Sequence, residues 1–201
     1  MTIALIDYGA GNVPSVERAL QRLGAESLRV TQSSQLECAK AIILPGVGHC
    51  AAMIRALDER QLRAGLLDAI SRGIAVLGIC LGLQALFDSS EEAPSLRGLG
   101  VLPGSVQSLP RTVKLPHMGW NRLNIQHSSR LLEGLGETDF FYFAHTYAAP
   151  NVSDAVVATC EHGATFAAVI ELDNLFAAQF HPEKSGAAGA RFLENFIRLV
   201  A

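Results

Sequence analysis

The chain has 201 residues, of which 49% are hydrophobic and 17% charged, and this balance predicts a large buried core rather than disorder. A formal net charge of -3, with no cluster of lysines and arginines, argues against a nucleic-acid-binding surface. No apolar stretch approaches the roughly 18 residues that a membrane span needs. The four cysteines show no Cys-x-x-Cys spacing, so we expect a reducing, cytoplasmic location without disulfides or a bound metal.

The first half of the chain alternates apolar runs with segments of helical spacing. The run at 2–7 predicts a first strand rather than a signal peptide, and Asn12 is placed to cap the helix that follows. We expect further strands at 28–30, 41–44 and 74–79, and helices at 13–23, 51–71 and 81–87. This alternation predicts a parallel sheet wrapped by helices.

After Glu92 the pattern changes to short apolar or alternating runs with turns between them. They predict antiparallel strands at 99–102, 123–125, 140–143, 156–160, 166–171 and 175–180, before a final helix at about 187–199. We find no repeat, low-complexity tract or linker, and therefore expect a single domain over 1–201. The predicted fold is α/β, with a mostly parallel central sheet, helices on both faces and a smaller antiparallel sheet.

Cys80 stands in the run Gly78-Ile79-Cys80-Leu81-Gly82, between a predicted buried strand and a predicted helix. Gly-x-Cys-x-Gly in this setting is typical of a nucleophile elbow, in which a tight turn exposes the nucleophile. The N–H of Leu81 would then face the oxyanion that forms on attack. Since most free cysteines are small core residues, the interpretation depends on a base nearby.

His181-Pro182-Glu183 follows the predicted strand at 175–180 and supplies such a base. In an extended chain, residues two apart point to the same side, so His181 and Glu183 would meet at the end of the strand. Cys80 also lies just beyond a strand, where open α/β folds build their sites. These positions predict a nucleophile, a base and an orienting carboxylate, although a surface ion pair is the commoner fate of such a His-Glu pair. Five other histidines lack both a strand-end position and a carboxylate two residues on: His49, His117, His127, His145 and His162.

The motifs at 78–84, at 180–183 and at 44–48 (Leu-Pro-Gly-Val-Gly) resemble the class I, or triad-type, glutamine amidotransferases. The resemblance implies hydrolysis of glutamine to glutamate and ammonia through a thioester on Cys80, with no cofactor. It also implies an oxyanion strand and contacts to the bound glutamine. The residues in those two roles are Gly46, Val47 and Gly48 with Leu81 for the oxyanion, and Gln84 and Glu92 for glutamine.

Three more stretches, at 7–12, 116–121 and 142–147, together with His-Pro-Glu-Lys-Ser at 181–185, resemble the glutaminase subunits of imidazole glycerol phosphate synthases. This finer resemblance implies histidine biosynthesis in a lyase complex. The partner would be the cyclase (synthase) subunit, in a heterodimer. That subunit would use the ammonia to make imidazole glycerol phosphate and aminoimidazole carboxamide ribotide. The residues implied to face it are Asn12, Trp120, Tyr142 and Lys184.

Other interpretations keep the triad but change its use. Glutaminase subunits for anthranilate, aminodeoxychorismate or pyridoxal phosphate synthesis share it, as does a paralogue that supplies ammonia for surface-sugar amidation. A stand-alone cysteine peptidase or γ-glutamyl hydrolase on a related fold is a third class. A non-catalytic partner protein is disfavoured because no triad position departs from the pattern.

Overall fold

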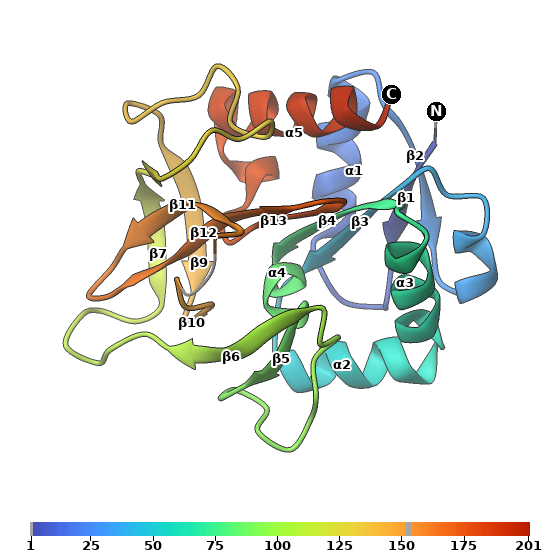
Figure 1. Ribbon diagram of the computed structural model, residues 1–201, viewed down its shortest axis with the longest axis horizontal. Coiled ribbons are helices and arrows are strands. Elements are labelled where there is room, and N and C mark those ends of the chain that lie inside the picture. Colours follow the sequence, from blue (N-terminus) through green and yellow to red (C-terminus); the bar gives the residue numbers. More distant parts are fainter. Residues whose placement is uncertain (1, 152–153) are drawn as a thin grey trace.

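A computed structural model describes residues 2–151 and 154–201 of the chain, built around one long sheet (Figure 1). In the described residues this sheet has eight strands in the order β2-β1-β3-β4-β13-β12-β11-β8. The run from β2 to β13 is parallel, and β12, β11 and β8 continue it antiparallel. The strands are β1 Thr2–Ile6, β2 Glu26–Val30, β3 Ala41–Gly46, β4 Ala75–Cys80, β8 Asn124–Ile125, β11 Val156–Glu161, β12 Thr165–Leu172 and β13 Leu175–Ala178.

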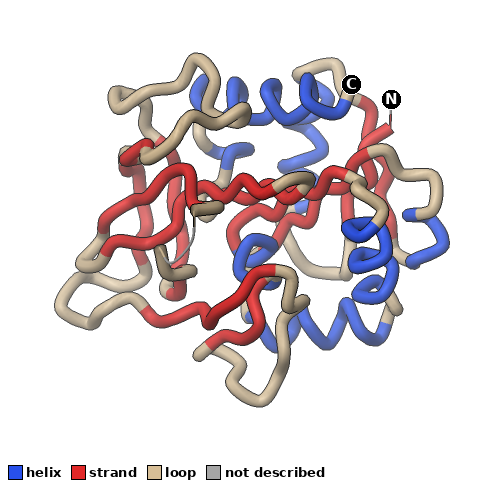
Figure 2. Tube along the Cα trace, in the orientation of Figure 1, coloured by secondary structure: helices blue, strands red, loops and turns tan. Residues whose placement is uncertain are grey.

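Helices cover both faces of this sheet, as Figures 1 and 2 show. The helices are α1 Val13–Arg22, α2 Cys50–Glu59, α3 Leu62–Ser71, α4 Leu81–Ala85 and α5 Gly186–Val200, with 3-10 turns at Ser33–Leu36 and Pro182–Lys184. Side chains of α1 and α5 pack on one face, and those of α2, α3 and α4 on the other. The predicted α/β class is therefore confirmed.

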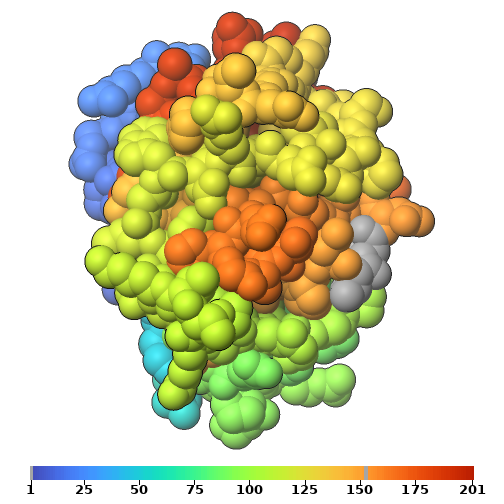
Figure 3. Space-filling model, turned by 90° about the vertical axis from the view of Figure 1, so that its left-hand side faces the viewer, coloured from blue at the N-terminus to red at the C-terminus, as the bar shows by residue number. Residues whose placement is uncertain are grey.

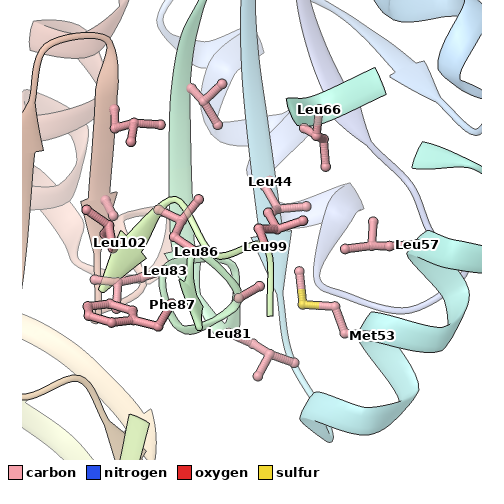
Figure 4. Packing of buried hydrophobic residues seen from close by; sticks show 14 of the residues in the cluster. Leu44, Met53, Leu57, Leu66, Leu81, Leu83, Leu86, Phe87, Leu99 and Leu102 are labelled. Carbon is pink, nitrogen blue, oxygen red and sulfur yellow. The ribbon is translucent and has the colours of Figure 1, made fainter. Parts of the chain in front are cut away.

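Each strand of the parallel region contributes to two hydrophobic cores, because successive side chains point to opposite faces. In β1, Leu5 faces the core beneath α1 and α5, whereas Ile6 faces the core beneath α2 and α3. Figure 4 shows part of the second core, where Leu44 of β3 lies near Met53 and Leu57 of α2. Burial on both faces explains why these strands read as continuous apolar runs.

Two smaller sheets stand beside the antiparallel end of the main sheet. They contain β5 Phe87–Ser90, β6 Leu102–Ser108 and β10 Tyr147–Ala148 in one, and β7 His117–Asn121 with β9 Phe141–His145 in the other. Figure 3 shows this end, where the orange atoms of the β11–β12 hairpin lie against yellow-green segments from the middle of the chain. His162 Nε2 at the hairpin tip bonds to the Lys114 carbonyl at 2.8 Å, which fixes the loop before β7.

The structure differs from the sequence predictions at several boundaries. The helix predicted at 51–71 is two helices, because Gln61 takes a left-handed conformation with φ of 57°. The helix predicted at 81–87 ends at Ala85, and Phe87 already begins β5. The strand predicted at 99–102 begins only at Leu102, and β7 was not predicted. No helix within the described residues is both long and apolar enough to cross a membrane.

Candidate active site

Cys80 sits in a strained turn between β4, which it ends, and α4, which begins at Leu81. Its φ of 53° is positive, a conformation that non-glycine residues rarely adopt. The flanking glycines leave room for this turn. A Cβ on Gly82 would lie 1.9 Å from the Leu44 carbonyl oxygen, and one on Gly78 would lie 2.8 Å from the Gly82 carbonyl carbon. The predicted elbow geometry is therefore present, with space for glycine alone at both positions.

The sheet register places two other segments beside Cys80. Gly46, the last residue of β3, is its partner on one side. On the other side Ala178 pairs with Ile79, so the residues just after β13 lie next to Cys80. A Cβ on Gly46 would approach the Leu81 Cβ to 2.6 Å, and Gly48 has φ of +95°. The segment at 46–48 is implied to bind the oxyanion. Because Gly46 and Gly48 have no side chain, this segment can lie directly against the elbow.

His181 and Glu183 form a buried ion pair, with Nδ1 of the imidazole donating to Oε1 of the carboxylate at 2.9 Å. The extended-chain reason given for this pairing was wrong, because Pro182–Lys184 is a 3-10 turn. Burial lowers the pKa of His181, but hydrogen bonds and charge interactions with Cys80 and Glu183 outweigh it and raise this pKa to about 10. The imidazole therefore carries a proton at neutral pH, next to the sulfur.

Asn12 provides the second contact to the carboxylate of Glu183. Its side chain was expected to cap α1 but makes no capping hydrogen bond. Instead, Asn12 Nδ2 donates to Glu183 Oε1 at 3.0 Å. Burial raises the pKa of Glu183, whereas hydrogen bonds from His181 and Asn12 lower it, and the net shift is downward. Asn12 thus helps to keep the orienting carboxylate ionised.

A cavity of about 340 Å³ opens over Cys80. It is lined by most of the residues that the sequence resemblance implies for catalysis and glutamine binding. Its wall includes Cys80, His181, Val47, Gly48, Gln84 and Glu92. Glu92 Oε2 accepts the backbone N–H of Cys50, at the start of α2, at 2.7 Å. Gln84 uses its amide nitrogen internally, donating to the Tyr147 carbonyl at 2.7 Å and to Gln179 Oε1 at 3.1 Å. On these two side chains, the groups that remain for a ligand are acceptor oxygens, which suit an ammonium group.

An exposed aromatic surface adjoins the mouth of this cavity. Trp120 is 55% and Met118 65% exposed, and both belong to β7. The Trp120 ring meets Tyr142 edge-on at 5.9 Å, and Lys184 Nζ lies 5.7 Å from the centre of the Tyr142 ring. Trp120 is thus exposed, as a residue that faces a partner would be. Because Met118 and Lys184 also line the cavity, the surface and the cavity are continuous.

A chain of neutral histidines borders the site and was not predicted as part of it. The statement that His145 lacks a strand-end position was wrong, because it ends β9 and pairs in register with His117 of β7. His145 Nδ1 donates to the Tyr147 carbonyl at 2.9 Å, and His117 Nδ1 lies 3.0 Å from His145 Nε2. Burial lowers the pKa of His117 to about 4 and that of His145 to about 3. Both are therefore uncharged supports for the Tyr147 carbonyl.

Comparison with known proteins gives consistent matches along the whole chain. The family described as glutamine amidotransferase class-I matches residues 4–200. The imidazole glycerol phosphate synthase subunit HisH of Methanothermobacter thermautotrophicus is 46% identical over 198 residues, which cover 98% of each chain. The subunit of the same name from Moorella thermoacetica is 44% identical over 199 residues, covering 98% of this chain and 95% of the relative. A crystal structure of a glutamine amidotransferase matches the fold with a TM-score of 0.78 at 23% identity, covering 98% of each chain.

Proposed function

Because the chain belongs to the class I glutamine amidotransferases, and among them to the imidazole glycerol phosphate synthase subunits HisH, we propose that Cys80, His181 and Glu183 hydrolyse glutamine. The ammonia passes to a cyclase subunit for histidine biosynthesis. One observation carries the proposal: a cysteine on a strained elbow and a histidine held by a buried glutamate line one cavity, and an exposed aromatic surface adjoins its mouth.

The reaction begins when the Cys80 sulfur attacks the side-chain amide carbon of glutamine. His181, which bonds to Glu183 through Nδ1, has the other ring nitrogen for the sulfur and the leaving group. The N–H of Leu81 and a backbone N–H of the Gly46–Gly48 strand stabilise the oxyanion, at roughly 3 kcal/mol for each donor. His181 then protonates the departing nitrogen, and ammonia leaves behind a γ-glutamyl thioester.

Hydrolysis of the thioester completes the cycle. His181, now neutral, takes a proton from water, which attacks the acyl carbon and releases glutamate. The acceptor oxygens of Gln84 and Glu92 suit the α-ammonium of the substrate, and that ammonium would offset the charge of Glu92. This arrangement selects an amino acid rather than a simple amide.

The partner surface is proposed to consist of the exposed residues around the cavity mouth. The exposed Trp120 and Lys184 lie there with the half-buried Tyr142, and large exposed aromatic side chains commonly anchor protein partners. Free ammonia is protonated in bulk water, so a sealed contact at this mouth would keep it reactive for the cyclase. We place the heterodimer in the cytoplasm, which is consistent with four free cysteines.

A glutaminase assay tests the proposal. Glutamate release is measured for the isolated chain, and for the chain with the cyclase subunit and its ribonucleotide substrate. We expect slow release alone and faster release in the complex. Cys80→Ala should abolish glutamine-dependent synthesis yet leave ammonia-dependent synthesis intact, whereas Cys38→Ala, at an exposed cysteine, should change neither. Survival of glutamine turnover in Cys80→Ala would refute the assignment.

A further inference from the structure

Gln179 is a completely buried polar residue that touches the sulfur of Cys80. It follows β13, has 0% of its surface exposed, and its Nε2 lies 3.6 Å from Cys80 Sγ. Its backbone N–H is already bonded to the Ala168 carbonyl at 2.9 Å, so the side chain is not needed to satisfy its own main chain. A buried amide needs partners for both its nitrogen and its oxygen, and one of the partners here is the reacting atom.

The orientation of this amide follows from a chain of hydrogen bonds. The Tyr147 carbonyl can only accept, so the Gln84 group that meets it at 2.7 Å is the NH₂ end. The second N–H of the same NH₂ meets Gln179 at 3.1 Å, which requires an oxygen there. Gln179 must therefore turn its own NH₂ toward Cys80. His145 Nδ1 donates to the same carbonyl at 2.9 Å and holds it in place.

We propose that Gln179 is a further catalytic residue, a hydrogen-bond donor to the Cys80 thiolate, and that Gln84 is the positioning residue that fixes its amide. The inference rests on the proposed glutaminase reaction. Donors favour a thiolate over a thiol, and an amide oxygen in the same place would repel it. Without Gln84, nothing in the described residues around the amide would dictate which end faces the sulfur.

The same donor serves both halves of the reaction. In acylation the sulfur lone pair forms the C–S bond, and the Gln179 N–H favours the thiolate that attacks. In hydrolysis water adds to the acyl carbon, the C–S bond breaks, and its electron pair returns to sulfur. The Gln179 N–H stabilises that leaving thiolate. Loss of the donor should therefore lower kcat with little change in KM, because the amide contacts the sulfur and not the substrate.

The positioning role of Gln84 can be separated from glutamine binding by measuring kcat and KM separately. If Gln84 acts through Gln179, Gln84→Met should lower kcat and slow the reaction of Cys80 with iodoacetamide, which contains no amino-acid group. If Gln84 instead only binds the substrate, Gln84→Met should raise KM and leave the alkylation rate unchanged. That second result would remove the positioning role.

The main test uses Gln179→Leu, which keeps the approximate size but has no donor. We measure glutamine-dependent kcat and KM in the complex, and alkylation of the Cys80 peptide by iodoacetamide, resolved by mass spectrometry because Cys38 is exposed and also reacts. A hydrogen bond to a charged group predicts a fall of about 10- to 100-fold in kcat and in alkylation rate. Ammonia-dependent synthesis should not change.

Asn195→Leu is the matched control, because Asn195 is equally buried and its amide donates to the Leu131 and Glu133 carbonyls, away from the cavity. It should lower the melting temperature without changing kcat or Cys80 alkylation. If Gln179→Leu matches this control, or raises KM alone, the proposal is overturned. If Gln179→Leu does not fold, the proposal is tested by the rate at which iodoacetamide alkylates Cys80 in Gln84→Met. An unchanged rate would overturn it. Cys80→Ala, assayed alongside, tests the glutaminase function itself, so each failure is distinguishable.

Discussion

Acidification from pH 7 to pH 5 should destabilise the fold through the neutral pair His117 and His145. Burial lowers the pKa of these side chains to about 4 and about 3, so both stay uncharged in the folded state at pH 5. In the unfolded chain a histidine titrates near pH 6.5, so each residue costs about 2 kcal/mol over this interval. The raised pKa of His181 works in the opposite direction. The two neutral histidines together should cost about 4 kcal/mol over this interval.

The assay is urea unfolding at pH 7 and pH 5, for the natural chain and for two variants. His145→Gln keeps a donor for the Tyr147 carbonyl and an acceptor for His117, so the protein should fold. Between pH 7 and pH 5, the free energy of unfolding of this variant should fall by about 2 kcal/mol less than that of the natural chain, because one titrating group is gone. His127→Gln, at an exposed histidine, should behave as the natural chain does. An equal loss in all three proteins would refute this reasoning.

Three further predictions concern single side chains. Glu183→Gln should lower the pKa of His181 and cut glutamine turnover by about 100-fold or more. Both effects are measured as glutamate release against pH. Unchanged turnover would show that the carboxylate does not orient the base. Tyr8→Phe should raise the free energy of unfolding by about 1 kcal/mol, because among the described residues the buried Tyr8 hydroxyl has no hydrogen-bond partner. A measured loss of stability would show that the hydroxyl accepts a hydrogen bond from the nearby Val47 N–H instead. Trp120→Ala should weaken binding of the cyclase subunit by about 2 kcal/mol, measured by calorimetry. The melting temperature of the isolated chain should not change. Equal affinity of the variant and the natural chain would place the interface elsewhere.

The elbow could be predicted from sequence because its determinants are local. An apolar run that is long enough for a buried strand leads directly to Cys80, and glycines stand where the turn has no space for a Cβ. His181 and Glu183 were also predicted as a pair, since they are only two residues apart. Their actual 3-10 geometry was missed, because a proline after a strand fits both an extended chain and a tight turn.

The contacts around the triad could not be predicted because they join distant parts of the chain. Gln84 and Gln179 are 95 positions apart, and Asn12 reaches Glu183 across 171 positions. Asn12 could also have capped α1 through a local hydrogen bond, but its side chain bonds to Glu183 instead. β7 was missed because its sequence, His-Met-Gly-Trp-Asn, has a glycine at its centre and exposes its two apolar side chains, so the strand depends on pairing with β9. The break at Gln61 occurs without the glycine that usually marks a left-handed residue.

The central claim, that Cys80 carries the acyl group of glutamine, is tested most directly by trapping the intermediate. The chain, in complex with the cyclase subunit, is mixed with glutamine, quenched in acid within the first turnover and digested for mass spectrometry. We expect a γ-glutamyl group on the peptide that contains Cys80, absent from Cys80→Ala and discharged when the quench is delayed beyond turnover. Glutamate release at full rate with no acyl group on Cys80, or with the group on another residue, would contradict the account.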